Sequence, residues 1–176
     1  KYFSYSMFIH RFIELSENSQ KLLFELLKKS QDETKADFLY FVMPLSQTGI
    51  STEMLSGVIQ GVKFGDETDE ILQKFLIDQD QDEVELCLSS DQYFCKIAEQ
   101  LLRQISPESP KATELLMTLT NVFNRNQDSE NNPGRNLLVM LLQTVKPEIY
   151  METVFETLKE ENSDQWMQLL TEISKS

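Results

Sequence analysis

The feature that most constrains this chain is the recurrence of large apolar residues at helical spacing. Leu, Ile, Val and Phe return at i, i+3, i+4 and i+7 along most of the sequence, as in Leu115, Leu116, Leu119, Val122 and Phe123. This period places the apolar side chains on one face of an α-helix. Ser, Asp, Asn and Pro stand where many of these stretches begin, which is typical of helix N-termini. The pattern predicts about ten amphipathic helices and an all-α fold.

The composition indicates one folded domain that covers residues 1–176. The chain is 40% apolar and has only five Gly and five Pro, which argues against a turn-rich β-sandwich, a collagen-like chain or a low-complexity segment. A chain of this length can bury most of its unfolded surface in one core. Because it starts at Lys1 without Met, already inside an amphipathic pattern, we expect a fragment of a longer protein.

The expected helices are joined by short polar turns, and starts two helices apart recur at roughly 30 to 43 residues, the range of helical repeats. The tetratricopeptide signature of Trp, Leu-Gly and Tyr is missing, and so is the ankyrin Thr-Pro-Leu-His. The pattern therefore resembles HEAT or armadillo repeats. This resemblance of architecture implies antiparallel helical hairpins stacked as a solenoid. The alternative is an irregular compact helical bundle.

Capping residues predict several helix boundaries. Ser51 is expected to cap a helix that Gly65 ends as a left-handed residue. Ser89 and Gln92 have the spacing of a capping box ahead of the next helical stretch. Pro147 is expected to open a helix at its first turn.

The net charge of −13 limits the classes of partner. It would repel the phosphates that nucleic-acid-binding proteins contact through Lys and Arg, and it disfavours anionic membrane surfaces. No stretch reaches the length of about 20 apolar residues that a membrane span needs. We therefore expect protein partners with a basic surface or a basic peptide, and no binding to nucleic acid or membranes.

Most of the negative charge lies in one segment. Residues 66–85 contain nine acidic residues and a single Lys, a net charge of −8. A run of this kind is typical of a solvated face. Alternatively, it is a docking surface that speeds the encounter with a basic partner. The nine residues are Asp66, Glu67, Asp69, Glu70, Asp78, Asp80, Asp82, Glu83 and Glu85.

Three of these acids, Asp78, Asp80 and Asp82, have the oxygen spacing of a calcium-binding loop. Glu83 stands where the sharp turn of that loop requires Gly, and Ser89 stands where a bidentate Glu should close the coordination sphere. We therefore expect a loop between helices at this place, with no metal ion.

Residues for catalysis are few. His10 is the only His, and Cys87 and Cys95 are eight positions apart, so the three cannot complete a zinc site. The cysteines are expected to be reduced core thiols, as in nuclear or cytoplasmic proteins. Neither a phosphate-binding loop nor a nucleophile elbow nor a zinc-protease motif is present. We expect no enzyme activity and no cofactor.

Three glycines, Gly57, Gly61 and Gly65, repeat every fourth position on a predicted helix. Such a series leaves a shallow groove on one helix face. A neighbouring helix of the same chain is the expected occupant, and a helix from a partner is the alternative. Gly57 and Gly61 are therefore candidate partner-binding residues.

The N-terminal stretch is rich in aromatic residues, with Tyr2, Phe3, Tyr5, Phe8 and Phe12. These are too many for the single apolar face of a terminal helix. Either a preceding segment covers the additional face, or the face is a hydrophobic interface.

Ser19, Ser30 and Ser46 are each followed by Gln and fall near expected helix ends. The dipeptide is similar to the sites of DNA-damage kinases, and phosphate near a helix end changes helix stability. A chain with this much Ser and Gln contains one or two such pairs by chance, so the pattern does not decide whether these residues are phosphorylated.

Together these features predict a non-catalytic protein-binding scaffold domain of a larger assembly. Grooves between successive helices would supply affinity, and the acidic segment would bias the choice of partner. A homodimerisation module is the alternative. A helical enzyme domain is the third possibility and would need a pocket with convergent polar groups.

Overall fold

The computed structural model describes residues 5–43, 45, 48–160 and 164–175, and every regular element in these ranges is a helix. This confirms the predicted all-α fold. Within the described ranges, none of the helices combines the length and the apolar character that crossing a bilayer requires. The elements are α1 (Tyr5–Glu14), α2 (Glu17–Lys28), α3 (Asp32–Val42), α4 (Thr52–Ile59), the 3-10 turn η2 (Gly65–Glu67), α5 (Thr68–Leu72), the π-helical turn η3 (Gln73–Ile77), α6 (Gln81–Ser90), α7 (Gln92–Leu102), α8 (Ala112–Arg125), α9 (Arg135–Thr144), α10 (Pro147–Glu160) and α11 (Asp164–Ser174).

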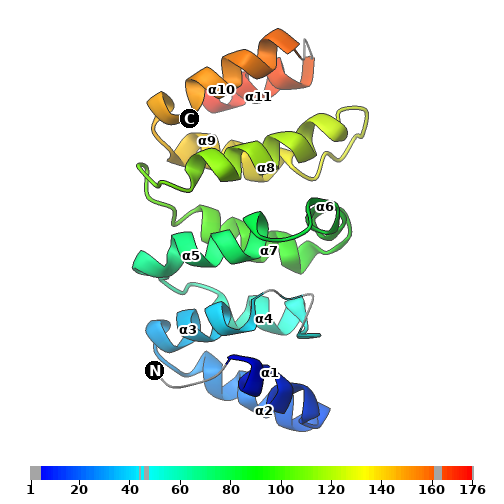
Figure 1. The fold of residues 1–176 in the computed structure, drawn as a ribbon, viewed down its shortest axis with the longest axis vertical. Coiled ribbons are helices and arrows are strands. Elements are labelled where there is room, and N and C mark those ends of the chain that lie inside the picture. Colours follow the sequence, from blue (N-terminus) through cyan, green and yellow to red (C-terminus); the bar gives the residue numbers. More distant parts are fainter. Residues whose placement is uncertain (1–4, 44, 46–47, 161–163, 176) are drawn as a thin grey trace.

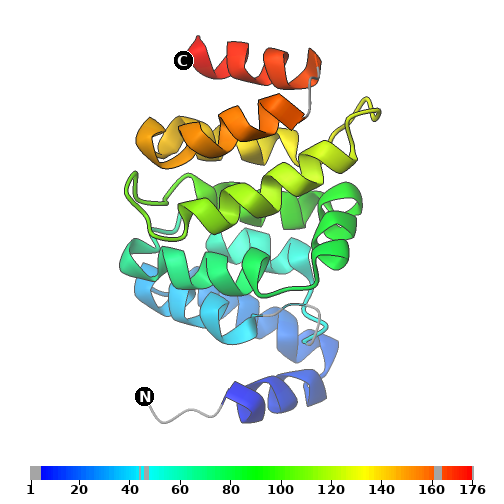
Figure 2. The ribbon, with the colours of Figure 1, turned by 45° about the horizontal axis from the view of Figure 1, so that its top comes forward.

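The helices lie in two rows along the longest axis of the molecule, in chain order from α1 and α2 at one end to α10 and α11 at the other (Figure 1). The first row contains α1, α3, α5 with its continuation η3, α8 and α10, and each contacts the next in the row. The second row contains α2, α4, α7, α9 and α11, and again each contacts the next in the row. The short helix α6 packs on η3 and α7 at one side of the rows (Figure 2).

The long-range hydrogen bonds that involve side chains join residues 31 to 43 positions apart among the described residues. For example, Thr52 Oγ1 donates to Asp91 Oδ2 at 2.8 Å, and Trp166 Nε1 donates to Asn124 Oδ1 at 2.7 Å. The second-row helices begin at intervals of 29 to 43 residues. Most of these hydrogen bonds therefore link one pair of successive helices, such as α3 with α4, to the next pair along the chain, such as α5 with α7.

The buried apolar side chains form one continuous core between the two rows. At the N-terminal end, the rings of Phe12, Phe24 and Phe38 pack on one another with centroids 5.8 to 6.5 Å apart. Near the C-terminal end, Phe123 meets Trp166 edge to face at 5.0 Å. Because each contact joins different helices, the amphipathic faces predicted from the sequence are buried against neighbouring helices.

The end of α4 differs from the prediction. Ser51 caps this helix as expected, and its side chain accepts a backbone N–H. The helix ends at Ile59, however, because Gly61 adopts a left-handed conformation with φ of 75° and the Val62 N–H bonds to the Ile59 carbonyl. Gly65 is also left-handed, with φ of 57°, but it begins η2 instead of ending α4.

The boundary between α6 and α7 also corrects the sequence analysis, which did not predict α6. Ser89 lies inside α6, so the predicted capping box at this residue is wrong. Asp91 is the N-cap of α7, because its Oδ1 accepts the N–H groups of Tyr93 and Phe94 at 3.0 and 3.1 Å. A carboxylate that accepts two free N–H groups is a strong cap. The prediction that Pro147 opens a helix is confirmed by α10.

Candidate functional site

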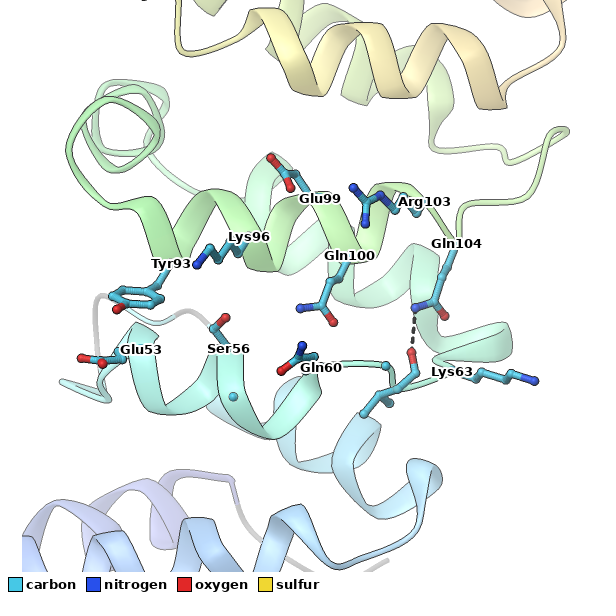
Figure 3. Close-up of a pocket in the computed structure, with 13 residues that line it drawn as sticks. Glu53, Ser56, Gln60, Lys63, Tyr93, Lys96, Glu99, Gln100, Arg103 and Gln104 are labelled. Carbon is cyan, nitrogen blue, oxygen red and sulfur yellow. Dashed lines mark hydrogen bonds between the residues drawn. The ribbon is translucent and has the colours of Figure 1, made fainter. Parts of the chain in front are cut away.

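A groove with a volume of about 620 Å³ lies between α4 and α7 in the second row (Figure 3). Its lining follows one face of each helix, because the contributing positions are spaced three or four residues apart. The α4 side consists of Glu53, Ser56, Gly57 and Gln60, and the main α7 positions are Tyr93, Lys96, Gln100 and Arg103.

Both ends of the groove are fastened by hydrogen bonds between its two walls. At one end, Thr52 Oγ1 donates to Asp91 Oδ2 at 2.8 Å. At the other end, Gln104 Nε2 donates to the Val62 carbonyl at 2.7 Å, and Gln104 Oε1 accepts the Phe64 N–H at 2.8 Å. Because α4 and α7 are held at two points, the groove is preformed.

The interior of the groove is polar. The side chains of Ser56, Gln60 and Gln100 point into the space between the helices (Figure 3). Neither Gln60 nor Gln100 makes a side-chain hydrogen bond within the described part of the chain. Each amide can donate and accept, so the groove offers both kinds of partner to a ligand.

The charges around the groove differ in sign from those of the whole chain. Lys63, Lys96 and Arg103 line it, against the carboxylates of Glu53 and Glu99. All three cationic residues are exposed, and none forms an ion pair with another described residue. A chain with a net charge of −13 therefore carries a groove with one more cation than carboxylates.

Tyr93 and Glu53 face each other at the end of the groove near the start of α7 (Figure 3). The Glu53 carboxylate therefore acts on the Tyr93 hydroxyl through its charge. The negative charge of Glu53 is the main reason that the pKa of Tyr93 is raised, with burial second. Lys96 Nζ lies 5.1 Å from the centre of the Tyr93 ring, within the range of a cation–π contact.

The structure does not bring the nine predicted acidic residues together. They form two groups at opposite ends of the helix made by α5 and η3 (Figure 1). The first group lies at η2 and the first turn of α5, and the second lies after η3 and in α6. The first group is Asp66, Glu67, Asp69 and Glu70, and the second group is Asp78, Asp80, Asp82, Glu83 and Glu85.

Much of the second acidic group has a local structural role. Asp80 is the N-cap of α6, and its Oδ1 accepts the N–H groups of Asp82 and Glu83 at 2.9 and 3.2 Å. Arg125 Nη1 lies 3.1 Å from Asp82 Oδ1 and 3.2 Å from Glu85 Oε2. The first turn of a helix favours negative charge because of the helix dipole. Asp80, which was predicted to lie in a loop between helices, therefore caps the start of α6.

The first acidic group lies at a helix start as well. Asp66 and Glu67 are in η2, while Asp69 and Glu70 are in the first turn of α5. Asp69 Oδ1 accepts a hydrogen bond from Ser109 Oγ at 2.8 Å. No group of three or more His, Cys, Asp or Glu side chains arranged for a metal ion occurs among the described residues.

The predicted glycine series does not lie on one helix, so that part of the prediction is wrong. Gly57 is inside α4, where Lys28 Cε of α2 lies 3.5 Å from the position that a Cβ would take. Gly61 and Gly65 lie beyond the end of α4 with positive φ. Gly57 and Gly61 nevertheless both line the groove.

Of the aromatic N-terminal residues, Tyr2 and Phe3 lie outside the described residues. Tyr5 and Phe8 belong to α1, of which the structure describes the backbone at these positions. Phe12 is buried in the core against Phe24 and Phe38.

Cys87 and Cys95 are free thiols that are partly buried and pack against the core, instead of lying fully inside it as predicted. Burial is the main reason that the pKa of each thiol is raised, and nearby carboxylates raise it further. The side chain of His10 is 79% exposed and its Nε2 lies 3.3 Å from Glu14 Oε1. None of these three side chains lines the groove.

The Ser-Gln pairs occupy helix ends where the structure describes them. Ser19 is in the first turn of α2 and accepts a hydrogen bond from Ser16 Oγ. Ser30 follows the end of α2 and donates to the Leu27 carbonyl at 2.6 Å. Ser46 lies outside the described residues.

Sequence reasoning missed most of the groove. Tyr93, Lys96, Gln100 and Arg103 are not candidates in the sequence analysis. The available signal was their spacing of three, four and three residues, which places them together on the polar face of a helix. The spacing does not reveal that another polar face lies opposite.

No protein-family model matches this chain, and neither a curated protein nor a solved structure matches it. The resemblance to HEAT or armadillo repeats therefore stays a prediction.

Proposed function

We propose that this chain is a protein-binding scaffold domain of a larger assembly, built as a HEAT- or armadillo-like stack of helical hairpins. The groove between α4 and α7 carries the proposal. Hydrogen bonds of Thr52 with Asp91 at one end and of Gln104 at the other join its two walls. Inside it, the side-chain amides of Gln60 and Gln100 make no hydrogen bond with other described residues and are free to bind a ligand. A preformed polar groove of this kind suits recognition, because little ordering is needed on binding.

The arrangement of hydrogen bonds supports a stack over an irregular bundle. In a stack, each repeat contacts its sequence neighbours, so contacts cluster near one repeat length. The long-range hydrogen bonds described above span 31 to 43 residues. A compact bundle would also join the first helices to the last.

A non-catalytic role is supported by the state of the reactive side chains. The thiolate is the nucleophilic form of cysteine, and the pKa values of Cys87 and Cys95 are raised. His10 lies on the exposed surface beside Glu14. The two free thiols also favour a reducing compartment, so we place the protein in the nucleus or the cytoplasm.

The two acidic groups add a second recognition surface to the proposal. Asp78 is exposed at one end of the α5 and η3 helix, and Asp66 and Glu70 are exposed at the other. Such fields steer a basic partner surface during encounter. Their effect would be on the rate of association more than on the final affinity.

The test is co-purification of the full-length protein from its own cells, with partners quantified by mass spectrometry. A groove-filled variant, Gln60→Trp with Gln100→Trp, should lose partners that the unaltered protein retains at constant ratio. The control places the same bulk outside the groove, at Met117→Trp with Gln168→Trp, both exposed positions. Equal recovery of partners with both variants, or recovery of nucleic acid without protein, would contradict the proposal.

Homodimerisation is a second candidate because α2 exposes an apolar face. Leu22 and Leu26 lie one turn apart, and each is 66% exposed. Sedimentation at increasing concentration would reveal a dimer. In that case Leu22→Lys with Leu26→Lys should return it to the monomer, whereas a monomer at all concentrations would exclude this function.

A further inference from the structure

We infer that the groove between α4 and α7 binds an extended acidic segment of a partner protein. This inference rests on the proposed scaffold function and specifies the chemistry of what enters the groove. It differs from the expectation drawn from the net charge, which points to basic partners. The local charges and hydrogen-bonding groups of the groove are the reason for the difference.

The length and polarity of the groove fit an extended chain. Tyr93 and Arg103 are ten residues apart on α7, which is about 15 Å at the helical rise. An extended chain advances about 3.3 Å per residue, so about four to five residues fit. An extended chain leaves its backbone N–H and C=O groups free for partners, and the amides of Gln60 and Gln100 can supply these. A bound helix satisfies its own backbone and would instead require an apolar groove.

The charges select an acidic segment. Six basic side chains form ion pairs with carboxylates in the part of the chain that the structure describes. These are Arg11, Lys21, Lys28, Arg125, Arg135 and Lys146.

Lys63, Lys96 and Arg103 line the same groove, and none of them forms an ion pair with another described residue. Lys96 and Arg103 are seven residues apart on α7, about 10 Å along the helix. That is the span of about three residues of extended chain. Two carboxylates of one bound segment can therefore pair with both side chains.

A partner protein segment is favoured over nucleic acid. Nucleic acid brings a dense line of phosphates that the net charge of −13 repels over a Debye length of about 8 Å at physiological salt. A short acidic segment carries few charges, and these lie close to the groove cations. The glutamine amides also match a peptide backbone.

The test uses the whole ¹⁵N-labelled chain and nuclear magnetic resonance. The probe is a blocked decapeptide of alternating Glu and Ser at low ionic strength, compared with a Lys and Ser decapeptide and a ten-residue oligothymidylate. The acidic peptide should shift the side-chain amide signals of Gln60 and Gln100. Lys96→Glu with Arg103→Glu should weaken its binding by about tenfold or more, since two pairs are replaced by repulsion.

The matched control, Lys111→Glu with Lys175→Glu, reverses the same number of charges outside the groove and should change affinity by less than about twofold. Circular dichroism checks the fold of each variant, and Lys96→Gln with Arg103→Gln replaces the reversal if that variant is unfolded. Three results overturn the inference: equal weakening by both pairs, tighter binding of the basic peptide or the oligonucleotide, or unshifted Gln60 and Gln100 signals. Failure of the scaffold function would appear separately, as cellular partners that groove filling does not displace.

Discussion

The groove between α4 and α7 and the acidic groups at the ends of the α5 and η3 helix use charge in opposite ways. In the second acidic group, Asp80 caps α6 and Asp82 and Glu85 contact Arg125. In the groove, Lys96 and Arg103 have no ion-pair partner among the described residues. Asp80, Asp82 and Glu85 therefore contribute to the fold, whereas Lys96 and Arg103 stay available to a ligand.

The density of charge in a sequence is a poor guide to a binding surface. The nine acids of residues 66–85 dominate the sequence, yet each group lies at a helix start, where negative charge stabilises the helix. The groove contributes two Lys, one Arg and amides from α7 and from the end of α4 with the turn after it, and these helices start at Thr52 and Gln92. Its charges become visible as a group when the helices are placed side by side.

The largest expected effect is on the groove side. Gln104→Ala removes both hydrogen bonds to the buried backbone at Val62 and Phe64. Two unpaired buried groups should lower the free energy of unfolding by about 3 kcal/mol. Urea unfolding measures this against Gln143→Ala, an exposed amide on α9. An equally small effect of both substitutions would show that the groove is not fastened at this end.

Removal of the N-cap of α6, which belongs to the second acidic group, should lower the stability of the protein. Asp80→Ala removes the side chain that accepts the first N–H groups of α6, and the free energy of unfolding should fall by about 1 kcal/mol. Asp128→Ala changes an exposed acid in a turn, where less than about 0.5 kcal/mol is expected. Thermal unfolding of the two variants compares them. If Asp80 were free for docking, both substitutions would leave stability unchanged.

The sequence predicts the all-α class and many helix starts, because apolar period and capping residues are local properties. Ser51 and Pro147 are examples. It does not predict α6, whose buried side chains are only Val84 and Leu88. Gly57 and Gly61 were predicted to line a groove because both were expected on one helix. They do line the groove, but only Gly57 lies in a helix. Lys96 is missed because its role depends on a helix that is distant in the sequence.

A smaller effect concerns the ion pairs of Arg125. Arg125→Gln removes its contacts with Asp82 and Glu85, which are partly exposed, so we expect a loss of about 0.5 kcal/mol. The loss should shrink at high salt because screening weakens the pairs in the unaltered protein. Lys96→Gln, in the groove, should show no such salt dependence. Unfolding at low and high salt checks both substitutions, and a salt-dependent loss for Lys96→Gln would mean that its charge is committed to the fold.

The smallest effect is a change in titration at the end of the groove. Glu53→Gln removes the negative charge that raises the pKa of Tyr93, so this pKa should fall toward its ordinary value. Tyr150 is the internal control, because its pKa is raised mainly by burial and should not move.

A raised pKa in the folded state keeps Tyr93 protonated to higher pH than in the unfolded chain, so stability falls as the pH rises above about 10. Glu53→Gln should reduce that fall. Absorbance titration of the tyrosines, with Tyr93→Phe to identify the signal, measures the shift. An unchanged Tyr93 titration in Glu53→Gln would mean that the Glu53 charge does not act on the Tyr93 hydroxyl across the groove.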